Sequence, residues 1–181
     1  MVVTIRVCAP GDERALALVG KATFLETYAG SLDRSDVLDH CDVEHGVPRY
    51  AAWLKTPDYR LWLAEVEGGA PVGYAVLGPS DLPIPTTVQD LELKRIYLLH
   101  RFEGAGVGRR LMDAAVEAAT AAGARRLLLG VYDENHHALA FYARQGFTQA
   151  GRKAFTIGST TYDDLVLGRP LQAGPMARAP G

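Results

Sequence analysis

IYLLHRFEGAGVGRRLMDAA, residues 96–115, is the most informative stretch of this chain. An apolar run typical of a strand leads into three glycines, Gly104, Gly106 and Gly108, and a run with the apolar spacing of a helix follows them. Backbone amides at the start of a helix, together with the positive end of its dipole, bind phosphate groups well. The pattern therefore predicts a phosphate-binding loop, the alternative being a plain strand-to-helix turn built from glycines.

Two known phosphate-binding loops do not fit these glycines. A Walker loop requires Lys and then Ser or Thr after its last glycine, whereas Arg109 and Arg110 stand here. A dinucleotide-binding fold requires G-x-G-x-x-G, a later acidic residue and repeated parallel crossovers. Asp133 could be the acidic residue, but the glycine spacing differs from G-x-G-x-x-G. The chain after the glycines predicts one helix and one antiparallel hairpin instead of repeated parallel crossovers. The favoured ligand is a pyrophosphate, with the first two glycines allowing close approach and the third tight packing of the helix start.

Composition and charge exclude several classes of function. The chain has 181 residues, 48% hydrophobic and 22% charged, which is typical of a folded domain. Its net charge of −2 argues against a nucleic-acid or anionic-membrane partner. Cys8 and Cys41 are too few for a disulfide framework and lack metal-ligand spacing, so we expect free thiols and no metal. The N-terminus has no signal-peptide pattern, and no stretch reaches the ~18 apolar residues of a membrane span, so we expect a cytoplasmic protein.

Residue periodicity predicts a single mixed α/β domain over residues 1–171 and a flexible tail over residues 172–181. Asp12 and Asn135 stand where they can cap the first and last helices. The expected strands are 1–7, 59–67, 72–77, 91–99, 125–132, 147–157 and 162–167, and the expected helices are 13–29, one or two within 33–56, 109–122 and 135–145.

The stretch from Leu91 to Phe147 resembles the GNAT superfamily of CoA-dependent N-acetyltransferases. EGAGVG, residues 103–108, matches the family signature Q/R-x-x-G-x-G/A except that Glu103 replaces Gln or Arg. NHHALAFYARQGF, residues 135–147, matches the family's asparagine followed by A-x-x-F-Y and G-F. The resemblance implies the GNAT fold, a mixed and largely antiparallel central sheet of about seven strands with helices on both faces. It also implies that the predicted phosphates are those of coenzyme A.

A narrower resemblance points to the bacterial spermidine/spermine-type branch of this family. Asp163 departs from the pattern, because that branch often has threonine at this position. The matching residues are Thr23-Phe24, Glu26-Thr27-Tyr28, Glu92-Leu93, Arg95-Ile96-Tyr97, Phe155, Gly158 and Asp164-Leu165.

The family resemblance implies direct transfer of an acetyl group from acetyl-CoA, the co-substrate, to a primary amine within a ternary complex. The acceptor would be a small amine, a polyamine or a peptide amino group. Backbone groups of residues 96–98 would pair with the pantetheine arm. The implied CoA-binding residues are Ile96, Tyr97, Leu98, Glu103, Gly104, Ala105, Gly106, Val107, Gly108, Arg109, Asn135 and Tyr142. We expect Glu103 to point away from the diphosphate or to pair with a nearby arginine.

Two side chains are predicted to move protons. Tyr142 would give a proton to the leaving thiolate, unless it is a packing aromatic. Glu92 would take the proton of the amine directly or through water, with Lys94 on the same face of the strand, unless it is an ordinary charged strand residue. His136 and His137 are weaker alternatives to Glu92. The acceptor site is expected to be walled by Phe24, Glu26, Tyr28 and Asp164.

Two further expectations accompany this interpretation. A protein that binds CoA as a sensor or scaffold, without transfer, is the alternative function. A homodimer is expected because dimers are common in the family.

Overall fold

The structure, a computed structural model, describes residues 2–158 and 160–172. All of the predicted tail except Gln172 lies outside the described residues. The elements in chain order are β1 (Val3–Val7), α1 (Glu13–Tyr28), α2 (Arg34–Glu44), α3 (Val47–Lys55), β2 (Arg60–Val66), β3 (Pro71–Pro79), β4 (Asp90–Leu98), the 3₁₀ turn η1 (His100–Phe102), α4 (Val107–Ala121), β5 (Arg126–Tyr132), α5 (His136–Arg144), β6 (Thr148–Ile157) and β7 (Thr160–Pro170).

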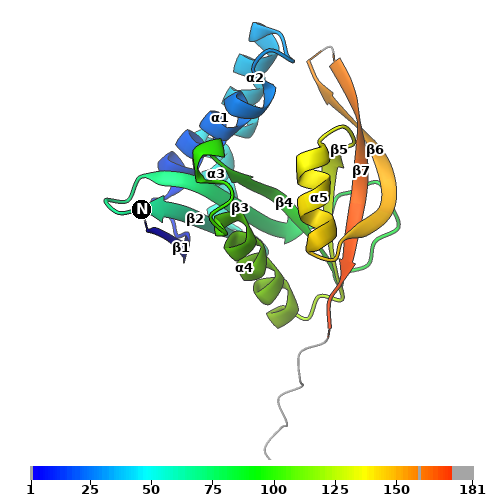
Figure 1. Ribbon diagram of the computed structural model, residues 1–181. Helices are drawn as coiled ribbons and strands as arrows, with labels where there is room; N and C mark the ends of the chain where they lie inside the picture. The colour runs from blue at the N-terminus through cyan, green and yellow to red at the C-terminus, as the bar shows by residue number, and fades with distance from the viewer. Residues whose placement is uncertain (1, 159, 173–181) are drawn as a thin grey trace, which may run out of the picture.

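The strands of the described residues form one sheet in the order β1-β2-β3-β4-β5-β7-β6 (Figure 1). Every neighbouring pair in it is antiparallel except β4 and β5. The seven-stranded, largely antiparallel sheet that the sequence predicts is therefore confirmed, and β1 is an edge strand, as its alternating pattern indicated. The parallel pair needs a crossover, and α4 provides it.

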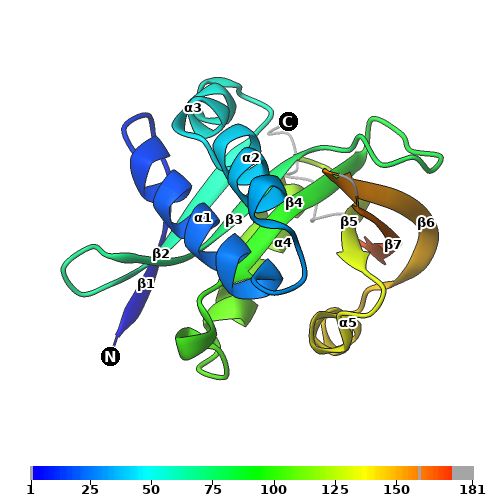
Figure 2. The same ribbon diagram turned by 90° about the horizontal axis from the view of Figure 1, so that it is seen from above.

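Helices cover both faces of the sheet. On one face α1 and α3 bury Leu16, Val19 and Tyr50 against β2 and β3, and Figure 2 shows α1, α2 and α3 crossing this side. On the other face α4 buries Leu111 and Met112, and α5 packs beside it through its aromatic residues. Two separate apolar layers thus lie on the two faces of the sheet, as the family resemblance implied.

The sheet opens between its two central strands. β4 pairs with β5 only from Asp90 to Glu92, opposite Arg126 to Leu128. Beyond that point β4 continues along β3 while β5 continues along β7. A register shift between β3 and β4, at Val76/Leu77, leaves Lys94 out of the pairing. The opening therefore exposes the second half of β4 to both faces of the molecule.

One local prediction is wrong. Asp12 precedes α1 but makes no side-chain cap to it. Its carboxylate instead accepts the Ala9 N–H at 2.8 Å and forms a bidentate ion pair with Arg6. The charged partner on β1 competes successfully with the helix amides, which carry only partial charges. Asn135 does cap α5, with its side-chain oxygen accepting the Ala138 N–H at 3.0 Å.

Within the described residues, none of the helices combines the length and the apolar character needed to cross a membrane.

Candidate active site

A cleft of about 1330 Å³ follows β4 from Leu93 to Leu98, the half of the strand that has left β5. Its walls come from α1 and α2 on one face of the sheet and from the starts of α4 and α5 on the other. The predicted residues that line it are Phe24, Glu26, Tyr28, Ile96, Tyr97, Leu98, Glu103, Gly104, Gly106, Gly108, Arg109, Asn135, Tyr142 and Asp164. Glu92, Ala105 and Val107 are not among the lining residues.

The glycine loop ends in a helix start suited to an anion. Gly104 and Gly106 have φ values of +76° and +78°, and Gly106 is the N-cap of α4. The first helical hydrogen bond runs from the Arg110 N–H to the Gly106 carbonyl, so the three preceding amides, 107–109, have no acceptor within the helix. The first turn of α4 contains no acidic residue. Amides, dipole and charge therefore all favour a bound anion at this position.

The three glycines of the loop differ in backbone conformation and in the space around them. At Gly104 and Gly106 a Cβ would have open space, so the positive φ is the local requirement. Gly108 was predicted to allow tight packing, and this is wrong, because an added Cβ would meet only the Phe141 ring at 4.0 Å. The space beside Gly108 belongs to the cleft instead.

The charged residues around the loop are arranged differently from the expectation. The polar side chain nearest to the Glu103 carboxylate is the His137 ring, with Oε2 3.9 Å from Nε2, and not an arginine. The Arg110 guanidinium donates a hydrogen bond to the Val3 carbonyl of β1 at 2.8 Å. Arg109 lines the cleft and lies 3.8 Å from Asp113 in a loose, exposed pair, so its guanidinium can turn toward a diphosphate.

Tyr142 reaches the cleft from α5. Its side chain is 8% exposed and packs edge-on against Phe141 and Phe147. Burial raises the pKa of its phenol, so the group carries its proton at neutral pH. No described residue forms a hydrogen bond with the hydroxyl, and the residue lines the cleft. A proton donor is thus present on the α4–α5 side of the opening.

Glu92 lies behind the cleft surface. Its Oε2 accepts hydrogen bonds from the Lys94 ammonium and from the Asp81 N–H, both at 3.1 Å. Burial raises the pKa of Glu92, although the Lys94 charge opposes the shift. The prediction that Lys94 faces Glu92 is confirmed, and Lys94 itself lines the cleft. Glu92 therefore has no direct contact with the space where an amine would bind.

The opposite wall of the cleft is aromatic. Phe24 and Tyr28 from α1 stand near the ring of His40 on α2, and Phe24 stacks on His40 with centroids 4.3 Å apart. The ring of Tyr162 on β7 meets Tyr28 edge-on at 6.4 Å. Glu26 has a structural contact, because it accepts the His100 N–H at 3.0 Å and so ties α1 to η1. Of the two adjacent histidines only His137 lines the cleft.

A buried polar network below this wall was missed from the sequence. Arg95 donates to the Glu44 carboxylate at 2.9 Å and to the Tyr50 hydroxyl at 3.0 Å. His45 is 3.0 Å from the same hydroxyl, and burial beside the Arg95 charge lowers its pKa to about 2. Arg95 lies 45 to 51 positions after its three partners in the chain, and the only signal was Arg95 within the family resemblance. The network joins α2 and α3 to β4.

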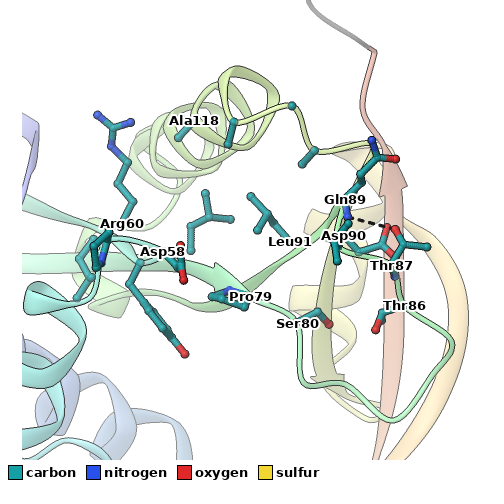
Figure 3. Close-up of a pocket in the computed structure, with 18 of the residues that line it drawn as sticks. Asp58, Arg60, Pro79, Ser80, Thr86, Thr87, Gln89, Asp90, Leu91 and Ala118 are labelled. Carbon is teal, nitrogen blue, oxygen red and sulfur yellow. Dashed lines mark hydrogen bonds between the residues drawn. The ribbon is translucent and has the colours of Figure 1, made fainter.

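A second hollow of about 1220 Å³ lies at the amino-terminal end of β4, away from the opening (Figure 3). The loop from Ser80 to Gln89 and the end of α4 border it, and Figure 3 shows the Thr87–Asp90 hydrogen bond on its rim. None of the predicted site residues lines this hollow. Within the described residues there is also no group of three or more His, Cys, Asp and Glu side chains suited to hold a metal ion.

The fold and the cleft fit the class of protein that the sequence motifs indicate, a CoA-dependent acyltransferase. Residues 27–147 match the acetyltransferase (GNAT) family, and the chain belongs to that family. It is an acyl-CoA-dependent acetyltransferase with acetyl-CoA as co-substrate.

Individual relatives agree with this assignment. An uncharacterized N-acetyltransferase of Mycobacterium tuberculosis is 31% identical over 160 residues, which cover 88% of this chain and 98% of the relative. An uncharacterized N-acetyltransferase of Lactobacillus delbrueckii is 26% identical over 84% of this chain and 88% of its own length. The crystal structure of the PaiA N-acetyltransferase of Thermoplasma acidophilum in complex with coenzyme A superposes with a TM-score of 0.76, at 20% identity, over 94% of this chain and 99% of that chain.

Proposed function

We propose that this protein acetylates a primary amine by direct attack of the amine on acetyl-CoA within a ternary complex. The observation that carries the proposal is the two-sided cleft at the β4–β5 opening. The amide-rich loop and Tyr142 approach it from the α4–α5 side, and the aromatic and acidic wall approaches it from the α1–α2 side. Donor and acceptor can therefore meet in the opening without an intermediate carrier.

The donor side would hold coenzyme A chiefly through backbone groups. The β4 edge from Ile96 to Leu98 is paired with β3 but not with β5, so the amides and carbonyls on its β5 side are available to the pantetheine arm. An amide near Leu98 would also stabilise the negative charge that develops on the thioester oxygen. The diphosphate would lie on the amides of residues 104–109. The Asn135 oxygen is used as a helix cap, which leaves its amide N–H₂ for the pantetheine.

In the chemical step the amine nitrogen attacks the thioester carbonyl carbon, and the carbon–sulfur bond then breaks. The sulfur leaves as a thiolate and takes the proton of the Tyr142 hydroxyl, giving free CoA thiol. An amine that binds as an ammonium gives one proton to a carboxylate before the attack, and its nitrogen loses a second proton after the attack. The second proton restores the Tyr142 hydroxyl through water and the first passes from the carboxylate to solvent, so the products are an N-acetyl amide, the thiol and one proton. A phenol whose pKa is raised by burial is fully protonated at the start of this step.

Two carboxylates are suited to take the amine proton. Glu92, the residue predicted from the sequence, would act through a water molecule beside Lys94, because its carboxylate does not reach the cleft. Asp164 lines the cleft directly, and burial raises its pKa. A proton acceptor with a raised pKa is better matched to an ammonium group than an ordinary carboxylate is.

The test is release of CoA thiol from acetyl-CoA across a panel of amines, with calorimetric binding of acetyl-CoA measured beside it. The panel holds spermidine, spermine, free amino acids, aminoglycosides and short peptides. We expect binding of acetyl-CoA and release that depends on the amine. Tight binding without release from any amine would favour the alternative of a CoA sensor, and absence of binding would contradict the assignment of the loop.

A further inference from the structure

A small notch lies over Gly130 on β5, at the acceptor side of the cleft. The position that a Cβ of residue 130 would take is 2.9 Å from the Lys153 Nζ and 3.8 Å from the Asp164 Oδ2. No carboxylate of the described residues lies within 4.0 Å of the Lys153 ammonium. Lys153 and Asp164 therefore lie near the same point without forming an ion pair. The missing side chain of Gly130 is what leaves room between them.

Strand alternation places these groups on one face. Lys153 of β6 is directly opposite Asp164 of β7, and Asp164 is opposite Tyr132 of β5, two residues from Gly130. Phe155 and Tyr162 follow by the same alternation and join Tyr28 in the aromatic wall. The notch therefore opens toward α1 and α2, on the side of the sheet opposite Tyr142.

The carboxylate of Asp164 faces the cleft. The residue is 7% exposed and lines the cleft, and no group of the described residues donates a hydrogen bond to it. Its oxygens are not among the fully buried polar atoms without a partner, so they reach the cleft, where a polar group can bind them. Partial burial raises its pKa, with Lys153 opposing the shift. The hydroxyl of Tyr162, two residues away, is buried without a partner.

Three other acids that line the cleft have donors within the protein. Glu44 is paired with Arg49 and Arg95, Glu26 accepts the His100 N–H, and Glu134 accepts the Tyr132 hydroxyl. Glu103 has no closer partner than the His137 ring at 3.9 Å, but it lies beside the glycine loop. Of the described acids that line the cleft away from that loop, Asp164 is the one without a donor, and a lysine lies beside it. A polyamine would bring its second ammonium toward that lysine, which disfavours it.

The geometry points to an acceptor that is a zwitterion, an α-amino acid whose ammonium binds Asp164 and whose carboxylate binds Lys153. The inference rests on the proposed function and gives its acceptor a chemical class. The ammonium group of the amino acid would donate hydrogen bonds to the Asp164 carboxylate. The carboxylate of the amino acid would form an ion pair with the Lys153 ammonium. The rings of Tyr28, Phe155 and Tyr162 offer an apolar wall for the side chain of the amino acid.

Matched acceptors test the carboxylate requirement. Each standard amino acid is compared with its own amide, for example L-phenylalanine with L-phenylalaninamide, and spermidine is included. The amide keeps the side chain and has the more readily deprotonated amine, so a preference for the acid cannot come from amine basicity. We expect kcat/KM for the best acid to exceed that of its amide about tenfold to a hundredfold, the range of a charge-assisted hydrogen bond.

Substitutions then locate the preference. Lys153→Met should remove it by lowering kcat/KM for the acid, while kcat/KM for the amide changes far less, so that the two values become similar. Asp164→Asn should lower kcat/KM for both. Gly130→Ala should act like Lys153→Met, because its methyl group would meet the flexible end of Lys153, at 2.7 Å from Cε, and would displace it while the backbone stays in place. Lys55→Met and Asp39→Asn, both exposed and outside the cleft, are the controls.

Direct binding separates this inference from the proposed function. In calorimetry with CoA-loaded protein, binding of an amino acid that Lys153→Met abolishes would support the zwitterion site even if no acetyl group were transferred. Turnover of amines with equal kcat/KM for acids, amides and spermidine would keep the proposed function and overturn this inference. Failure of every free amino acid to bind would overturn it as well.

Discussion

Among single residues, Tyr142 is the one whose position follows most directly from the sequence. The F-Y pair before G-F predicted an aromatic hydroxyl on a helix, and α5 brings it to the cleft. Its neighbours Phe141 and Phe147 hold the ring by edge contacts, while the hydroxyl bonds to none of the described residues. Packing thus fixes the ring and leaves the hydroxyl for chemistry.

Tyr142→Phe should lower kcat by about a hundredfold or more, the usual contribution of a positioned acid. The phenyl ring keeps the packing, so the dissociation constant of acetyl-CoA should change less than about twofold. Steady-state kinetics and calorimetry measure the two effects. Tyr59→Phe, a ring stacked on Trp53 outside the cleft, is the control. Equal losses in binding and in kcat would show that Tyr142 is a packing residue.

His45 should make the stability of the protein depend on pH. Burial, the Arg95 charge and nearby His40 lower its pKa to about 2, whereas the unfolded group titrates at about 6.5. Below pH 6.5 the unfolded state therefore binds a proton that the folded state does not, and stability falls as pH falls. This one group contributes a slope of about 1.4 kcal/mol per pH unit.

Urea titrations of wild type and His45→Gln between pH 6.5 and 4.5 give this contribution as a difference between two slopes, because His40, Glu92 and Asp164, whose pKa values are also shifted, are present in both proteins. His45→Gln should flatten the slope by about one proton. His137→Gln, at an exposed position, should leave it unchanged. An identical slope in wild type and His45→Gln would contradict the assignment of a buried neutral imidazole.

At the scale of elements, the start of α4 depends on glycine conformation. Gly106 at its start and Gly123 beyond its end both have a φ of +78° and open space around a Cβ. A side chain at either position is strained to the same degree, but only the first position lies in the cleft. The pair therefore separates backbone strain from ligand binding.

Gly106→Val should weaken acetyl-CoA binding at least tenfold, because the loop leaves the geometry that presents its amides and the side chain enters the cleft. Gly123→Val should lower the melting temperature about as much as Gly106→Val does, because the backbone strain is the same. It should leave acetyl-CoA binding unchanged. Calorimetry and thermal unfolding of both variants provide the comparison. Unaltered affinity in Gly106→Val would refute the role of the loop.

Most elements were predictable from the sequence, because their apolar periodicity and their glycine and proline boundaries are local. The errors arose where a distant group competes with a local preference. The Asp12 carboxylate pairs with Arg6 instead of capping α1. Gly108 faces open space, whose extent depends on how α5 packs. Local residue patterns contain no information about such partners.

At the scale of the whole molecule, the parts of the site that the sequence missed are those built across layers. Arg95 meets Glu44 and His45 because α2 and α3 fold over β4. Lys153 reaches Gly130 across β7, since both lie on one face of the sheet. The cleft residues on the side proposed for CoA could be named from the sequence because two short motifs, residues 103–108 and 135–147, contain most of them. The side proposed for the acceptor comes from at least four separate elements.

Several whole-molecule expectations stay predictions. They are the extent of the domain over residues 1–171, the cytoplasmic location and the homodimer. Sedimentation of the purified protein at several concentrations would test the last of these.

The central claim is that an acetyl group moves directly from acetyl-CoA to an amine across the β4–β5 opening. The most direct measurement follows acetyl-CoA with an isotope-labelled acetyl group through one turnover, with mass spectrometry of the amine, the protein and free acetate. We predict that the label appears on the amine nitrogen in amounts equal to the CoA thiol released, and that the protein carries none. Label on the protein, or release as free acetate, would contradict the account.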